Sequence, residues 1–251
     1  MKFLQKKFII NHLKKLGLKK KDNILLYANL TTFGFKSKTF PKFLIQQIKK
    51  IVTQKGTIIM PLYNFNLNEK IKYSKYNIYK KINKNLLYNF FFYEKNKKIS
   101  NSIIHRHFGI GYLSKYLTYD KHNESFGYNS NFNFFLKKKF KLILLGCSPN
   151  EGATYLHQVE NLAKVPYRKM IILRKKIFIR KNIAINYKYY ARKNNNYVEN
   201  FDSFFENYIS RKKLKIQKNK YYKSFSITIN DLHKLSLQLL KKDKYALVKK
   251  V

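Results

Sequence analysis

The sequence predicts a single α/β domain whose strands pair in parallel through helical crossovers. Two features support this fold class. Residues 23–61 read as a strand–helix–strand unit, and Leu142–Leu145 is a continuous apolar run of the kind found in strands buried on both faces. The chain of 251 residues has the length of one large domain, so we expect residues 1–251 to form one domain.

The first unit begins with a short apolar run, Asn23–Tyr27, which has strand character. A loop follows. Apolar side chains then recur at helical spacing, namely Phe40, Phe43, Leu44, Ile48 and Ile51. Thr39 is the expected N-cap of this helix, and Pro41 lies in its first turn. The next strand is Thr57–Pro61, and a helix of this length is the usual connection between two parallel strands.

The segment 66–100 predicts little regular structure, whereas the C-terminal segment predicts a helix. Residues 66–100 are rich in Lys, Asn, Tyr and Ile and read poorly, as an insertion would, but the aromatic run Asn89–Tyr93 indicates packing against the body. The C-terminal segment predicts an amphipathic helix with Asn230 or Asp231 as its N-cap. Its apolar face consists of Leu232, Leu235, Leu239 and Leu240.

The formal net charge is +42, from 54 Lys and Arg against 12 Asp and Glu. Only six of the basic residues are Arg, and Lys is spread through every segment, whereas phosphate recognition favours clustered basic residues and the planar Arg fork. Asn, Ile, Tyr, Phe and Lys share AT-rich codons, so genome composition explains much of this charge. A nucleic-acid-binding protein is therefore the weaker interpretation. The content of 45% hydrophobic residues is enough to bury a core.

The sequence shows no membrane span, no signal peptide and no pair of cysteines. No apolar stretch approaches the roughly 18–20 residues needed to cross a bilayer, and Met1–Lys7 does not lead into the apolar segment of a signal peptide. The single Cys147 excludes an internal disulfide framework and a Cys-based zinc site. We expect a cytoplasmic protein. The oligomeric state stays open between a monomer and a homo-oligomer.

The segment that follows Leu142–Leu145 carries the candidate chemistry. A Gly- and Pro-containing loop leads into helical periodicity, which places Thr154, His157 and Glu160 near one helix face at the carboxyl end of the sheet. The positive end of the helix dipole disfavours the charged form of His157, and a general base must be neutral to accept a proton. Glu160 would instead favour the charged form, and it could also orient the ring. A structural histidine and a surface pair of Glu160 with Lys164 are the competing interpretation.

Several motifs in order resemble the aminoglycoside 3-N-acetyltransferase family. The family pattern is Leu-Gly-x, a short loop, Thr-x-x-His-x-x-Glu and then Tyr-Arg. Here it is matched by Leu145-Gly146, Thr154, His157, Glu160 and Tyr167-Arg168. Leu16–Asp22 and Gly56–Pro61 resemble the family's opening, and Ser125-Phe126-Gly127 with Ser130 resembles relatives associated with surface-glycan gene clusters.

This resemblance implies a three-layer α/β/α sandwich with a central mixed, largely parallel sheet, and an enzyme that moves an acetyl group from acetyl-CoA to an amine. His157 then corresponds to the catalytic base, Thr154 to a residue supporting the tetrahedral intermediate or the base, and Glu160 to the carboxylate that orients the ring. Glu199 and Asp202 are further candidates for that carboxylate. The residues implied to contact the cofactor are Tyr27, Asn29, Leu30, Thr31 and Ser125. No metal is expected.

The chain departs from the family at one informative place. The family usually has His-Ser-Ser-Leu after its first strand, and this chain has Tyr27-Ala28-Asn29-Leu30, which removes the serine hydroxyls. Twelve carboxylates also disfavour an acidic pocket for a polycationic antibiotic and favour a neutral or anionic amino sugar, including a nucleotide-linked one.

Two other functions compete with the enzyme. A family member that has lost catalysis could serve as a scaffold, which the altered loop favours and the joint retention of Thr154, His157 and Glu160 disfavours. His105 and His107 alternate on a predicted strand and could share a face toward a metal, but no carboxylate lies beside them.

Overall fold

The computed structural model describes residues 3–34, 39–63, 65, 87–88, 91, 93–118, 123–178, 182–218 and 221–251. Within them the main sheet has seven strands in the order β3-β4-β2-β1-β5-β10-β9. These strands are β1 (Asn23–Ala28), β2 (Thr57–Pro61), β3 (Lys98–Ile99), β4 (His107–Gly111), β5 (Lys141–Leu145), β9 (Lys215–Lys218) and β10 (Lys223–Thr228). Central β1 pairs in parallel with β2 and β5, whereas β4 and β10 join in antiparallel orientation.

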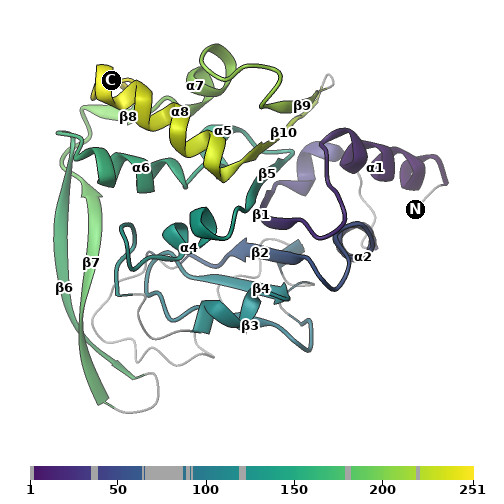
Figure 1. The fold of residues 1–251 in the computed structure, drawn as a ribbon, viewed down its shortest axis with the longest axis horizontal. Coiled ribbons are helices and arrows are strands. Elements are labelled where there is room, and N and C mark those ends of the chain that lie inside the picture. Colours follow the sequence, from purple (N-terminus) through teal and green to yellow (C-terminus); the bar gives the residue numbers. More distant parts are fainter. Residues whose placement is uncertain are drawn as a thin grey trace.

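Helices cover both faces of this sheet (Figure 1). One face carries α1 (Phe3–Lys15) and α2 (Phe40–Val52). The other carries α4 (Asn131–Lys137), α5 (Pro149–Gly152), α6 (Leu156–Ala163), α7 (Phe201–Asn207) and α8 (Ile229–Lys242). The described residues also include the short 3-10 helices η1 (Leu30–Phe33) and η3 (Ser114–Thr118).

Alternate residues of the central strand feed two separate cores. Ile24 and Leu26 belong to the cluster with α1 and α2, while Leu25 and Tyr27 belong to the cluster with α4, α6 and α8. This follows from the two-residue repeat of a strand, which sends successive side chains to opposite faces. The predicted three-layer α/β/α fold with a mixed sheet is therefore confirmed, with the parallel pairing at its centre.

The helix boundaries differ from the prediction at the C-terminal helix. α2 begins after Thr39 with Pro41 in its first turn, as expected. By contrast, the N-cap of α8 is Thr228, not Asn230 or Asp231, because β10 runs directly into the helix and the Thr228 side chain accepts a hydrogen bond from Asp231 N at 3.0 Å. Asp231 thus lies inside the first turn, where a carboxylate is also favourable.

The helix predicted to carry Thr154, His157 and Glu160 begins later than expected, and a separate short helix precedes it. Ser148 and Glu151 form a capping box around α5, which fixes an earlier helix start. Ala153 then closes α5, Thr154 lies in a turn, and α6 begins only at Leu156. The expectation that Thr154 shares a helix face with His157 and Glu160 is therefore wrong. His157 and Glu160 remain together on α6.

The part of the chain that the structure describes contains two further, smaller sheets. β6 (Arg168–Phe178) and β7 (Asn182–Arg192) form a long antiparallel ribbon along one side of the body, and β8 (Tyr197–Glu199) pairs with β11 (Val248–Lys250) (Figure 1). Because β6 starts shortly after α6, its first residue returns to the side of that helix. Residues 66–86 of the predicted insertion lie outside the described residues. In the aromatic run Asn89–Tyr93, residues 89, 90 and 92 also lie outside the described residues. Phe91 is fully buried with its ring 4.9 Å from that of Phe108, as expected, whereas Tyr93 is exposed.

Candidate active site

His157 in the first turn of α6 and Glu160 one turn later form a close pair. The imidazole Nδ1 lies 2.6 Å from Glu160 Oε2. The Glu160 side chain is fully buried, whereas that of His157 is 16% exposed. A buried carboxylate at this distance holds the Nδ1 proton and fixes the ring, so Nε2 is left with the lone pair that a general base needs.

The Glu160 carboxylate is held by residues that follow the helix. Tyr167 donates a hydrogen bond to Glu160 Oε1 at 2.9 Å, and Arg168 Nε lies 2.6 Å from Oε2 as an ion pair. Arg168 Nη2 also donates to Glu199 Oε1 at 2.9 Å, and the other Glu199 oxygen pairs with Arg192. One chain of alternating charges thus links α6, β6, β8 and β7.

This geometry separates the three candidate carboxylates. Glu160 touches His157 directly, and Glu199 reaches the pair only through Arg168. Asp202 instead accepts two hydrogen bonds from Asn150, from the backbone N at 3.1 Å and from Nδ2 at 2.9 Å. Of the three, Glu160 is therefore the one placed to orient the imidazole.

The surroundings of the pair favour a neutral imidazole beside an ionised carboxylate. Burial and the positive charge of Arg168 lower the pKa of His157, against the opposing effect of Glu160 and Glu199. Burial alone would raise the pKa of Glu160, but the contacts with His157, Arg168 and Tyr167 outweigh it and the pKa is lowered. The sequence left open whether the lowering or the raising influence dominates at His157, and in the structure the lowering influence does.

Arg168 Nη2 also approaches His157 Nδ1, at 3.0 Å. Arg168 Nη2–H could donate to Nδ1 only if Nδ1 carried no proton, whereas the contact with Glu160 requires a proton on Nδ1. The two contacts therefore require different tautomers of His157. The carboxylate contact is shorter and charge-assisted, and we assign the proton to Nδ1 on that basis. Arg168 Nη2–H is then directed to Glu199.

Thr154 has different partners from His157. Its backbone O accepts the bond from His157 N at 3.1 Å, but its hydroxyl lies beside the hydroxyls of Tyr27 and Tyr63, which are hydrogen-bonded to each other. Burial raises the pKa of both tyrosines, so both stay protonated. The structure therefore places a cluster of three hydroxyls at the carboxyl ends of β1 and β2.

The loop after β1 forms η1 and is tied to the loop after β5. Asn29 Oδ1 accepts bonds from Thr31 N at 3.3 Å and Thr31 Oγ1 at 2.6 Å. The Thr32 hydroxyl bonds to Gly146 O at 2.9 Å. A Cβ on Gly146 would lie only 2.4 Å from Thr32 Oγ1, so glycine is what allows the two loops to approach.

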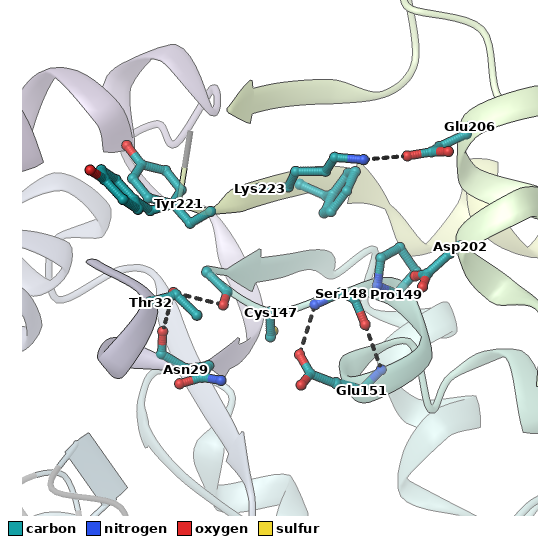
Figure 2. Close-up of a pocket in the computed structure, with 13 residues that line it drawn as sticks. Asn29, Thr32, Cys147, Ser148, Pro149, Glu151, Asp202, Glu206, Tyr221 and Lys223 are labelled. Atoms are coloured by element: carbon teal, nitrogen blue, oxygen red, sulfur yellow. Dashed lines mark hydrogen bonds and ion pairs between the residues drawn. The ribbon is translucent and has the colours of Figure 1, made fainter. Parts of the chain in front are cut away.

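A cavity of about 440 Å³ opens between these loops and β10 (Figure 2). Asn29, Thr32 and residues 146–149 line one side of it, and Tyr221, Tyr222 and Lys223 line another. Of the expected cofactor contacts, Asn29 lies in the wall, Leu30 and Thr31 belong to the adjacent η1, and Tyr27 lies in the hydroxyl cluster. Their binding roles stay predictions.

Three carboxylates also line this cavity, Glu151, Asp202 and Glu206. The scarcity of acidic residues in the sequence did not indicate such a gathering. Glu206 pairs with Lys223 Nζ at 2.6 Å, whereas Glu151 caps α5 and Asp202 accepts hydrogen bonds from Asn150, which are contacts with neutral donors. Lys223 therefore offsets one of the three negative charges in the cavity wall.

Ser125 lies in a buried loop beside α6. Its side chain is 1% exposed, its hydroxyl is 3.2 Å from Tyr187 OH, and its N–H donates to Lys188 O. The cofactor contact expected of Ser125 stays a prediction. The residue that sequence reasoning missed here is Gln158, whose fully buried amide bonds to both backbone groups of Gly127. Its polarity inside an otherwise apolar helix face was the available signal.

The two histidines considered for a metal site, His105 and His107, have different partners in the structure. His107 Nδ1 lies 3.1 Å from Asn131 Nδ2, and the His105 ring packs against Phe126 with centroids 4.5 Å apart. Among the described residues, no group of three or more His, Cys, Asp and Glu side chains is arranged to hold a metal ion. Within the same residues, no helix has the length and apolar character to cross a membrane.

Comparison with known proteins gives a consistent result. The family described as aminoglycoside 3-N-acetyltransferase matches residues 25–241. No curated protein sequence matches the chain. Among solved structures, the YokD protein from Bacillus subtilis is 19% identical with a TM-score of 0.72, and the alignment covers 95% of this chain and 99% of that one.

Two further structures are similar to this fold. AAC-IIIb in binary complex with CoASH is 14% identical, with a TM-score of 0.74 and coverage of 94% of this chain and 96% of that one. AAC-VIa bound to sisomicin is 13% identical, with a TM-score of 0.75 and coverage of 94% and 97%. At these identities the likeness establishes the fold.

Proposed function

This chain belongs to the aminoglycoside 3-N-acetyltransferase family, and we propose that it transfers an acetyl group from acetyl-CoA to the amine of an amino sugar, with His157 as the general base. One observation carries the proposal: the 2.6 Å contact of His157 Nδ1 with a fully buried Glu160, in surroundings that keep the imidazole neutral. The rest of the site supplies a hydroxyl cluster and a cavity at the same edge of the sheet.

The proposed chemistry uses His157 Nε2 to accept and then return one proton. The acceptor amine attacks the thioester carbonyl carbon while Nε2 takes the amine proton. The C–S bond then breaks, and the departing CoA thiolate takes that proton from Nε2, which leaves His157 neutral again. Glu160 stabilises the imidazolium that forms, because its carboxylate lies against Nδ1–H. The Thr154 hydroxyl is proposed to donate toward the developing oxyanion, where one donor contributes about 10²-fold.

We propose that the cavity between the β1 and β5 loops holds the thiol-ended arm of the co-substrate. Its volume is about 440 Å³, and Gly146 allows the two loops beside it to approach each other. CoASH is bound in the AAC-IIIb structure, and we propose that acetyl-CoA enters this cavity as co-substrate with Asn29, Leu30 and Thr31 at its entrance. The missing serine hydroxyls of the family loop leave the backbone N–H groups and the Asn29 side chain as the polar contacts.

We propose a neutral or nucleotide-linked amino sugar as the acceptor. Lys223 offsets one of the three carboxylates that line the cavity, and the chain carries a net charge of +42, which attracts anions and repels polycations. Turnover on kanamycin-type aminoglycosides is compared with turnover on nucleotide-linked amino sugars. Efficient acetylation of the antibiotics alone would overturn this part of the proposal.

The role of His157 is tested by His157→Asn. We expect acetyl-CoA affinity, measured by calorimetry, to stay close to that of the unsubstituted protein, while kcat falls by roughly 10²–10⁴-fold. Thr154→Val should lower kcat by about 10²-fold with CoA affinity retained. Full activity of a folded, CoA-binding His157→Asn protein would contradict the proposal. Failure to bind acetyl-CoA at all would instead favour the scaffold interpretation.

A further inference from the structure

We propose that Arg168 is a positioning residue that balances the charge of the His157–Glu160 pair and so keeps His157 in the neutral form that accepts a proton. This inference rests on the proposed function of His157. The family pattern includes an arginine at this place, and the structure now supplies contacts from which a role can be argued.

Folding places Arg168 between two carboxylates that come from different elements of the chain. It begins β6, its side chain is 6% exposed, and it lies between a carboxylate on α6 and another on β8. Its Nε is 2.6 Å from Glu160 Oε2 and its Nη2 is 2.9 Å from Glu199 Oε1. Arg192 on β7 pairs with the remaining oxygen of Glu199. The guanidinium thus lies between two carboxylates, hydrogen-bonded to Glu199 and paired by charge alone with Glu160.

Counting the charges of this network, which is buried at Glu160 and Arg168 and partly exposed at Glu199 and Arg192, explains what Arg168 does. Two carboxylates and two guanidinium groups cancel, so the network is neutral when His157 is neutral. Protonation of His157 then places an uncompensated positive charge in a site from which water is largely excluded, which is costly. Without Arg168 the network would carry a net negative charge, and the same protonation would be favourable. Arg168 therefore decides which form of the imidazole is stable.

The groups that face His157 from all neighbouring elements agree with this account. Glu160 lies on its own helix, Arg168 on β6 and Glu199 on β8, and the rings of Phe126 and Phe201 pack at 5.6 Å and 5.3 Å. His105 is also near enough to interact electrostatically, but burial keeps its pKa well below the usual range, so it adds no charge near neutral pH. Arg168 is the cation that acts most strongly to lower the pKa of His157.

Substitutions at the two ends of the network should move the pKa of His157 in opposite directions. Arg168→Gln removes a positive charge and should raise it by roughly one to three units. Glu199→Gln removes a negative charge and should lower it. Arg168→Lys keeps the charge and should leave the pKa near that of the unsubstituted protein. Arg211→Gln makes the matched change at an exposed arginine and serves as the control.

The measurement is an NMR titration of the imidazole nitrogens, with His157 assigned by the signal missing in His157→Asn. Opposite shifts in Arg168→Gln and Glu199→Gln, with no shift in Arg211→Gln, are the expected result. An unchanged pKa in folded Arg168→Gln, or shifts of the same sign in both variants, would overturn the inference. If Arg168→Gln does not fold, the sign of the shift in Glu199→Gln decides.

The titration also separates this inference from the proposed function, because it does not depend on turnover. Full activity of His157→Asn would refute the base role and leave the charge balance measurable. The kinetic counterpart applies when that role holds: the acidic limb of the kcat/KM profile should move to higher pH in Arg168→Gln, and the lost activity should return as the pH is raised.

Discussion

Gln158 and Gly127 exchange two hydrogen bonds, from Gly127 N to Gln158 Oε1 at 2.6 Å and from Gln158 Nε2 to Gly127 O at 3.2 Å. Gln158 is fully buried and directly follows His157. The loop that contains Gly127 also carries Phe126, whose ring packs at 5.6 Å from the His157 ring. The pair therefore fixes one wall of the site against the helix that bears the proposed base.

Gln158→Ala should destabilise the protein through this contact. It leaves the backbone N–H of Gly127 without the Gln158 acceptor, while Gly127 O still accepts from Ser130 Oγ at 2.8 Å. A buried unsatisfied group costs about 1–3 kcal/mol, so we expect a loss of about that size in the free energy of unfolding, measured by urea denaturation. Gln46→Ala on the exposed face of α2 is the control and should change it little. Equal stability of the two variants would contradict the role of the Gln158 amide.

Glu160→Gln should change the pH dependence of catalysis as well as the rate. The carboxylate raises the pKa of His157, so its removal lowers that pKa further and moves the acidic limb of kcat/KM to lower pH. The amide oxygen can still accept from Nδ1–H, so the loss in kcat should be smaller than the roughly 10²–10⁴-fold loss expected for His157→Asn. A limb that stays in place in the pH–rate profile would refute the assigned contact.

Gly146→Ala and Gly34→Ala form a matched pair, since both glycines have positive φ angles, +68° and +66°. A new Cβ at Gly34 meets nothing within 4 Å, so Gly34→Ala should cost only the backbone strain of about 1–2 kcal/mol. The same Cβ at Gly146 would lie 2.4 Å from Thr32 Oγ1 and 2.7 Å from Asn29 O. Gly146→Ala should therefore cost a further 1–3 kcal/mol or so in thermal or urea unfolding. Equal losses would show that the loops separate freely.

His12 should make stability fall in mild acid. Burial and Lys15 lower its pKa to about 4, below the value of about 6.5 in the unfolded chain. Between these values the unfolded state binds more protons, so the contribution of His12 falls by about 2 kcal/mol between about pH 7 and pH 5. His12→Phe, which can pack with Phe8, Phe33 and Tyr222, should remove that part of the pH dependence of unfolding. An unchanged pH dependence would assign the effect to other groups.

The sequence was sufficient to predict the central strands, α2 and the contact of His157 with Glu160, because these depend on apolar runs, helix caps and the spacing of residues one turn apart. It placed the start of the site helix wrongly, since helical periodicity does not reveal that the capping box of Ser148 and Glu151 begins a separate helix. It also gave no account of Arg168 with Glu199. These residues are 31 positions apart, and only the β6–β7 ribbon brings them together.

The helix that carries His157 is only eight residues long, yet three of its consecutive or near-consecutive side chains are bonded to different parts of the molecule. His157 and Glu160 face the charged network, and Gln158 is bonded to the loop at Gly127. A helix held in this way cannot rotate or slide without breaking buried bonds, so its amide hydrogens should exchange with solvent only through large-scale unfolding. Adjustments that admit a substrate must then come from the surrounding loops, while the proposed base stays in a constant position through the catalytic cycle.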